Sequence, residues 1–276
     1  MTVHQTPGAV QLRLRLSAGW IRITTQETQE TRVDVIPLND DPASVEAAAA
    51  VREELRRRED HFEVTVEAPE HNHRFFGFGR QPQLGFEITA PKGTSLAASV
   101  ASADVSGTGS FGDIEVRSAS GDVLFEEVAG LATIKTASGD VRLEGAGRGA
   151  DVKTASGDVR LSKVEDRLRA TLVSGDLEVY GVAGSTHAST VSGDIRIENA
   201  SRGDATLRSV SGDMLLDVVP GCSVWLDVSS LSGDTSSELE LGEAPAAERA
   251  DLELHASSVS GDIRVTRGHE RTAAGL

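Results

Sequence analysis

The sequence predicts an all-β protein, a parallel β-solenoid of about nine 18-residue coils with an N-terminal β segment and one capping helix. Three observations predict it: a tripeptide at fixed spacing, alternating apolar and polar residues beside it, and turn-forming residues between the alternating segments. The octapeptide TASGDVRL, at residues 136–143 and again at 154–161, contains all three. Eighteen residues are too few for a strand–helix–strand crossover. They suit one solenoid coil, whose strands stack in parallel about 4.8 Å apart.

The tripeptide Ser-Gly-Asp marks one turn of each coil. Its spacing is constant in the centre of the array and lengthens towards the C-terminus, with copies that begin at Ser120, Ser138, Ser156, Ser174, Ser192, Ser211, Ser232 and Ser260. A degraded copy, Ser-Ala-Asp, begins at Ser102, one regular step before the first complete copy. Together the copies supply a column of aspartates: Asp104, Asp122, Asp140, Asp158, Asp176, Asp194, Asp213, Asp234 and Asp262.

We interpret this aspartate column as a structural turn ladder. A reaction centre needs different residues that converge once, whereas a residue repeated in every coil performs the same task each time. Cation binding along the ladder is a weaker alternative, because carboxylates stacked about 4.8 Å apart repel one another. Catalysis is weaker still, and we expect no metal and no cofactor.

Alternation indicates which side chains face the core. After the turn, the first and third residues of VRL at 159–161 are expected inside and the arginine outside. Before the turn, Ile134 and Val152 lie two residues before Thr136 and Thr154, so all four are expected inside. The Ser of each Ser-Gly-Asp follows the same parity and is also expected to face inward. The opposite reading, with Thr and Ser outward as in ice-binding solenoids, would place Ile134 and Val152 in water.

The same alternation places the residue before each Ser-Gly-Asp on the outer face, where these residues form an apolar column. It consists of alanines in the first coils and of larger side chains in the later ones: Val173, Val191, Val210, Leu231 and Val259. One reading is ordinary exposed surface, or cover by the insertion between Ser232 and Ser260. The other is a lateral contact surface for a protein partner or for self-association.

The N-terminal third, residues 1–95, is expected to be a β segment that leads into the repeat domain at 96–267 and a tail at 268–276. Alternation predicts strands at 11–16, 20–25 and 31–37 and in the stretches HFEVTVEAP and GFEITAPKG. SAGWIRI is similar to SGDVRL, so the coils can begin there. An alanine run and REELRRRED predict a helix at about 43–59, which we expect to cap the open end of the solenoid.

A loop between two predicted N-terminal strands carries a second candidate for partner binding. Phe75, Phe76 and Phe78 lie there and could dock a partner, or pack back onto the first coil. His71 and His73 have metal-ligand spacing, but no third ligand is visible in the sequence.

Composition excludes several classes of function. The net charge of −16 disfavours binding to nucleic acid or to an anionic membrane. The single cysteine excludes an intrachain disulfide framework, and no apolar run of transmembrane length or signal peptide is visible. We expect a cytoplasmic location. No phosphate-binding loop, HExxH or GxSxG motif is present, so no enzymatic activity is expected.

The stretch FEITAPKGTSLAASVASADVSGTGSFGDIEVRSASGDVLFEEVAG resembles the bacterial "putative adhesin" family of β-strand-repeat domains of unknown function. The resemblance covers roughly Gly85 to Thr266 and implies a β-solenoid without known catalytic residues. The leading hypothesis is therefore a non-enzymatic scaffold, or a protein-interaction or adhesion-like module. The alternatives are a polysaccharide-binding or polysaccharide-acting β-helix and a polymerising cytoskeletal β-helix.

Overall fold

The computed structural model describes residues 1–69, 81–239 and 250–268 of the chain. Strands make up most of this part, and its one helix lies in the N-terminal third. The predicted all-β parallel solenoid is confirmed. The chain divides into two compact units, unit 1 (Met1–Ala146) and unit 2 (Gly147–Leu276), which are described separately.

Unit 1 contains parallel coils made of stacked strands. β7 (Ser95–Phe111) pairs in parallel with β8 (Ile114–Ser120) along its first half and with β9 (Val123–Val128) along its second. The next coil, β10 (Ala132–Ser138) and β11 (Val141–Ala146), stacks on β8 and β9 in the same register. Each strand thus lies beside the equivalent strand of the next repeat, as the repeat spacing predicted.

The N-terminal strand β2 (Val10–Gln26) is itself a coil of unit 1. It pairs in parallel with β7, with Ala18 opposite Ser102 and Trp20 opposite Asp104, so SAGWIRI occupies the Ser-Gly-Asp position as expected. The two predicted strands at 11–16 and 20–25 are one continuous strand. On its other side β2 pairs with β5 (Phe62–Glu67) and β6 (Leu84–Pro91).

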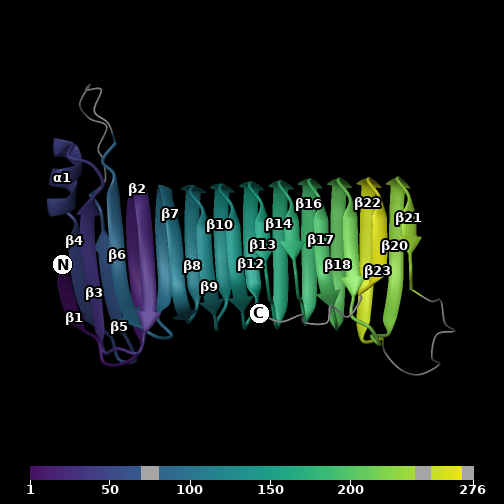
Figure 1. Cartoon of the computed structure of the whole chain (residues 1–276), viewed down its shortest axis with the longest axis horizontal. Coiled ribbons are helices and arrows are strands. Elements are labelled where there is room, and N and C mark those ends of the chain that lie inside the picture. Colours follow the sequence, from purple (N-terminus) through teal and green to yellow (C-terminus); the bar gives the residue numbers. More distant parts are fainter. Residues whose placement is uncertain (70–80, 240–249, 269–276) are drawn as a thin grey trace, which may run out of the picture. The chain divides into compact units, whose positions relative to one another are not determined.

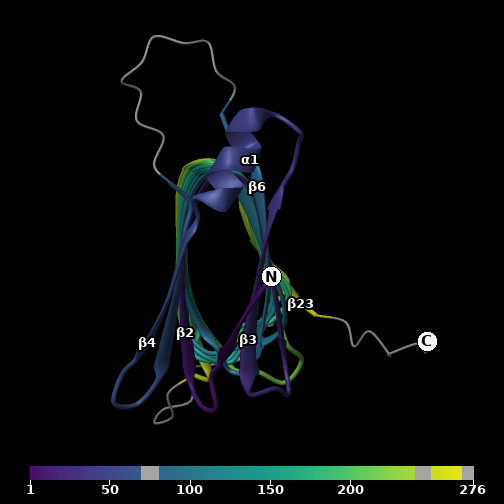
Figure 2. The same cartoon turned by 90° about the vertical axis from the view of Figure 1, so that its left-hand side faces the viewer.

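Antiparallel strands close the N-terminal end of unit 1. β3 (Glu30–Pro37) pairs with β6, β4 (Arg52–Arg57) with β5, and β1 (Thr2–Gln5) with β3. The helix α1 (Pro42–Ala49) packs against β3 and β6 (Figure 2). Its N-cap Asp41 accepts a hydrogen bond from Ala43 N, and Ser44 Oγ accepts one from Gln83 N at 3.1 Å.

The prediction of a helix over residues 43–59 is wrong for its second half. The helix ends at Ala49, and Arg52–Arg57 form strand β4 instead. The antiparallel partner β5 explains the difference, because it places Leu55 opposite Val64 and satisfies the backbone of a segment with high helix propensity. This pairing joins neighbouring strands of a hairpin, and alternation in β5 was the visible signal for it.

Unit 2 continues the same construction with six strand pairs. The first three coils are β12 (Ala150–Ser156) with β13 (Val159–Leu161), β14 (Arg167–Ser174) with β15 (Leu177–Val179), and β16 (Ser185–Ser192) with β17 (Ile195–Ala200). The others are β18 (Gly203–Ser211) with β19 (Met214–Val218), β20 (Val224–Ser232) with β21 (Thr235–Ser237), and β22 (Leu252–Ser260) with β23 (Ile263–Arg267).

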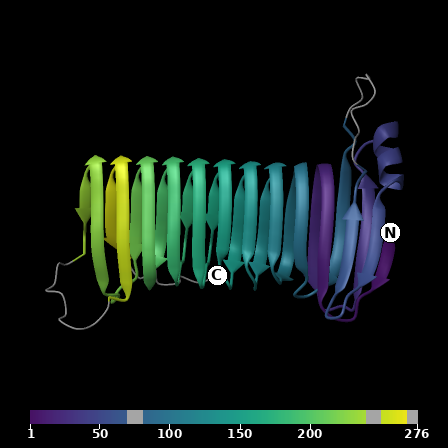
Figure 3. The same ribbon diagram turned by 180° about the vertical axis from the view of Figure 1, so that it is seen from behind.

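The last coil in the sequence is not the last coil in the stack of unit 2. β22 pairs with β18 on one side and with β20 on the other, and β23 likewise lies between β19 and β21. Figures 1 and 3 show the yellow β22–β23 coil between two green ones. The chain passes over one coil position, builds the end coil, and then returns to fill the gap. The lengthened steps of the repeat, from Ser211 to Ser232 and from Ser232 to Ser260, are the sequence signal of this exchange.

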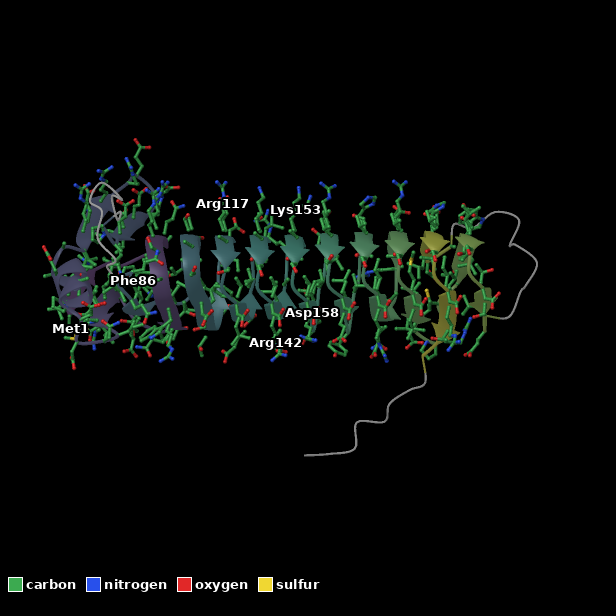
Figure 4. The ribbon with its side chains drawn as sticks, turned by 90° about the horizontal axis from the view of Figure 1, so that it is seen from above. Met1, Phe86, Arg117, Arg142, Lys153 and Asp158 are labelled. Atoms are coloured by element: carbon green, nitrogen blue, oxygen red, sulfur yellow. The ribbon has the colours of Figure 1, made fainter. Side chains whose placement is uncertain are left out.

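The predicted inward columns form the core. Ile134 and Val152 are fully buried, and Thr136 and Thr154 are 8% and 4% exposed, which excludes the outward Thr-x-Ser arrangement. The Ser residues of Ser-Gly-Asp are exposed, however, because the chain already turns at this corner. In Figure 4, the outward Arg117 and Arg142 of unit 1 extend from opposite faces.

Candidate interaction surfaces

Backbone hydrogen bonds link the aspartates of the ladder from coil to coil. In unit 1, Asp122 N donates to Asp104 Oδ1 at 3.0 Å, and Asp140 N donates to Asp122 Oδ1 at 2.9 Å. Unit 2 repeats the contact at 2.8–3.1 Å along Asp158, Asp176, Asp194, Asp213, Asp262 and Asp234, in that stacking order. Each accepting carboxylate therefore binds the turn of the next coil in the stack, which is a structural role of the kind that the sequence predicted.

Arginine side chains balance part of this negative charge in unit 2. Arg160 Nη2 lies 3.2 Å from Asp158 Oδ2, and Arg160 Nε lies 3.2 Å from Glu178 Oε2. The described residues contain no group of three or more His, Cys, Asp or Glu side chains with the geometry to hold a metal ion. With one carboxylate oxygen of each linked residue occupied by a backbone N–H, the ladder is arranged to join coils.

The outward apolar column of unit 2 forms a continuous stripe, which we call the valine stripe. Its members occupy equivalent positions on neighbouring strands and are each about half exposed or more: Val173 51%, Val191 49%, Val210 48%, Val259 48% and Leu231 84%. The exchange of the last two coils places Val259 between Val210 and Leu231. The stripe thus runs across five stacked strands of one sheet face, from β14 to β20.

The borders of the valine stripe are mostly neutral. On one side lie the exposed Ser residues of the Ser-Gly-Asp corner. Two residues away on the other side lies a column of Thr171, Ser189, Arg208, Ser257 and Ser229. A polar surface therefore frames an apolar strip, the composition that distinguishes contact surfaces from scattered exposed apolar residues.

Two adjoining cavities lie on the outer face of unit 1, where β7 presents small side chains. One of 470 Å³ is lined by residues that include His61, Ser95 and Ala97, and one of 340 Å³ by residues that include Arg13 and Arg117. The charged side chains are engaged with acids, since Arg13 Nε lies 3.4 Å from Glu63 Oε2 and Arg117 Nη2 lies 2.6 Å from Glu115 Oε1.

A hollow of 350 Å³ in unit 2 gathers acids and bases on one face. Asp176, Asp194, Asp213 and Asp262 line it together with Arg196 and Arg264. This combination is the one that an enzymatic reading would need. All of these residues belong to repeated columns, however, and each of the four aspartates accepts a backbone hydrogen bond from the next coil. The hollow is therefore lined by residues that recur from coil to coil, and it does not bring together a separate set of catalytic side chains.

The remaining candidates from the sequence are the aromatic and histidine residues of the N-terminal loop and the single cysteine. Phe75, Phe76 and Phe78, with His71 and His73, lie outside the described residues. Cys222 is 8% exposed and its Sγ donates to Ser201 O at 3.1 Å. Burial and the charge of Asp251 raise the pKa of the Cys222 thiol, so it stays protonated at neutral pH.

Trp225 is an exposed aromatic that the sequence analysis did not single out. It is 48% exposed on β20 and its ring lies 5.0 Å from that of His255 on β22. Its outward position follows from the alternation in VWLDV, which could have identified it.

The comparisons with known proteins cover nearly the whole chain. A solved structure described as a putative cell adhesion protein from Clostridium sporogenes shares 9% identity over 97% of this chain and 98% of that one, with a TM-score of 0.25. A putative adhesin from Bacteroides fragilis shares 14% identity over 97% and 95%, with a TM-score of 0.49. No curated protein gives a significant match.

No described helix has the length and apolar character needed to cross a membrane. The model of one protein family, Toastrack DUF4097, matches residues 21–266, which include the C-terminal end of β2 and the repeats of both units. This match covers most of the chain, and the chain belongs to the Toastrack DUF4097 family.

Proposed function

We propose that this chain is a non-enzymatic protein-interaction module that binds a protein partner through the valine stripe. One observation carries the proposal: a continuous row of exposed, mostly β-branched side chains crosses the stacked strands of unit 2. Strands about 4.8 Å apart hold these side chains in a regular row, so the stripe offers a preorganised surface for which little side-chain entropy is lost on binding.

The chemistry of the described surfaces supports binding over catalysis. The acids gathered in the hollow of unit 2 are members of the ladder, and their hydrogen bonds hold coils together. The buried Cys222 has a raised thiol pKa, which disfavours a nucleophile. A stripe framed by hydroxyl groups has instead the makeup of a contact surface, with an apolar centre and a polar border.

A pair of charge substitutions tests this proposal. Val191→Lys with Val210→Lys places two ammonium groups in the centre of the stripe, where burial against a partner would desolvate them. Both positions are about half exposed, so the melting temperature should change little. In affinity capture from the native host, proteins retained by the wild type should be lost.

The matched control is His187→Lys with Thr206→Lys, which adds two lysines to the same strands, β16 and β18, on the same face. These positions lie four residues from the stripe, roughly 13 Å along the strand. The control should retain the partner. Loss of the same proteins from both variants, or from neither, would reject the stripe as the binding surface.

A further inference from the structure

The end coil of unit 2, β20 with β21, is paired on one side only. β20 pairs with β22 and β21 with β23, and within residues 1–69, 81–239 and 250–268 no strand pairs with their other edge. The inward side chains of Val224, Leu226 and Val228 are partly exposed, whereas Leu252 and Leu254 on the neighbouring β22 are 1% and 0% exposed. Among the described residues, the end coil thus has an unpaired sheet edge and a partly exposed core.

This edge lacks the features with which proteins normally prevent strand pairing. β20 and β21 contain no Lys, Arg or Pro, and their one charged side chain, Asp227, lies 3.4 Å from His255 Nδ1. Strand β4 of unit 1, whose one partner among the described strands is β5, reads REELRR and is protected by charge. Unprotected edges of this length and apolar character are pairing sites.

The hydrogen bonds of β20 determine which residues can pair across the edge. Leu252 N donates to Ser223 O, so the backbone groups of Ser223, and of alternate residues after it, face β22. The N–H and C=O groups of Val224, Leu226, Val228 and Ser230 therefore face the open edge. An antiparallel partner must match these even-numbered residues with residues that also present free groups.

A second copy of this chain meets this condition. Suppose that two β20 strands pair antiparallel, with Val228 opposite Val228 on a two-fold axis. Every even-numbered residue, whose backbone groups face the open edge, then lies opposite an even-numbered residue of the other copy. Trp225 then lies opposite Leu231 of the other copy, at a non-hydrogen-bonded pair where side chains approach most closely. Asp227 lies opposite Ser229. Shifting the register by one residue per strand would instead place Asp227 against Asp227.

We propose that two copies of the chain form a two-fold dimer by antiparallel pairing of β20 centred on Val228. The register accounts for two side chains that the single chain leaves exposed, Trp225 at 48% and Leu231 at 84%. Pairing also continues the sheet that contains β20 and covers the partly exposed Val224, Leu226 and Val228. The proposal goes beyond the function of the valine stripe, because it uses the end of the stack and requires no other protein.

Cysteine trapping tests the register. In the dimer, the Cα atoms of Val228 and its symmetry mate are about 5.5 Å apart, within disulfide range. Val228→Cys should therefore give a covalent dimer on mild oxidation of the full-length protein. Leu226→Cys is the control on the same strand and same side, since its symmetry mate lies four residues away, roughly 13 Å. The wild type controls for the native Cys222.

Analytical ultracentrifugation tests the dimer itself. The wild type should sediment as a dimer at micromolar concentration, and Leu231→Arg should weaken dimerisation at least tenfold without altering the melting of the single chain. Val210→Arg, in the same stripe but two coils from the edge, should remain dimeric. A monomeric wild type, or equal trapping at 226 and 228, would overturn the proposal; slow exchange of the β20 amide hydrogens in that monomer would show that the chain's own segments cover the edge.

Discussion

At the scale of single residues, glycines of the Ser-Gly-Asp turns such as Gly193 lie against the backbone of the adjacent coil. Gly193 has φ of +137°, and a Cβ atom there would lie 2.2 Å from Gly175 O. Gly193→Ala combines backbone strain with a clash that the stacked backbone cannot relieve, and should lower the free energy of unfolding by about 3 kcal/mol.

Gly221 provides the control for this substitution. Its φ is +81°, but a Cβ there would meet nothing within 4 Å. Gly221→Ala should therefore cost only about 1 kcal/mol, for the left-handed backbone alone. Urea denaturation of both variants measures the difference, and equal losses would mean that coil stacking does not demand the glycine.

The aspartate ladder makes a second prediction at this scale. Asp194 Oδ1 accepts the hydrogen bond from Asp213 N at 2.8 Å. Asp194→Ala removes the acceptor and should destabilise the protein by about 1 kcal/mol. Asp194→Asn keeps an acceptor oxygen and removes repulsion within the column, so its stability should equal or exceed that of the wild type in denaturant titrations.

The same two variants separate a structural ladder from a cation-binding one. If the carboxylates bound calcium, added calcium would raise the melting temperature of the wild type and Asp194→Asn would abolish that rise. The structural ladder predicts a melting temperature that calcium at constant ionic strength leaves unchanged.

At the scale of elements, a hydrogen-bonded pair joins the start of the end coil to the inserted coil. Asp251, just before β22, accepts bonds at Oδ2 from Ser223 N at 2.9 Å and from Ser223 Oγ at 2.8 Å. These bonds, the backbone one first, lower the pKa of the Asp251 carboxyl in the folded protein. The contribution to stability is therefore present above the unfolded-state pKa of ~3.9 and is lost as the pH falls through the lower, folded-state pKa.

Asp251→Asn should accordingly melt at a lower temperature than the wild type at pH 7, and the gap should close as the pH falls through the lowered pKa of Asp251. Thermal melts at a series of pH values measure it. Asp227→Asn, a neighbouring exposed acid near His255, controls for the loss of one negative charge. A gap that is constant with pH would exclude the ionised carboxylate as its cause.

Helices and strands could be predicted from the sequence where the pattern that specifies them lies within the segment itself. The alternation in Val159–Leu161 and the parity of Ile134 with Thr136 correctly assigned core and surface, because side-chain direction in a strand follows sequence spacing. Arg52–Arg57 were assigned to the wrong element because their residues favour helices, and their strand form depends on pairing with β5.

At the scale of the whole chain, the repeat predicted the solenoid but not the order of its coils. Whether β20 or β22 lies beside β18 depends on pairing between segments that are distant in the sequence, and both strands carry the same alternation and the same Ser-Gly-Asp turn. The stripe residues were predictable from parity. The open edge beside Trp225 was not, because it exists only once β22 has taken the inner position.

The most direct test of the central claim, that the repeat builds an interaction surface at the valine stripe, is site-specific photo-crosslinking in the native host. A benzophenone amino acid replaces Val191 in one variant and His187, on the same strand and face, in the other. The account predicts a discrete covalent adduct with a protein from position 191 and little or none from position 187. Equal adducts at both positions, or no adduct at 191, would contradict it.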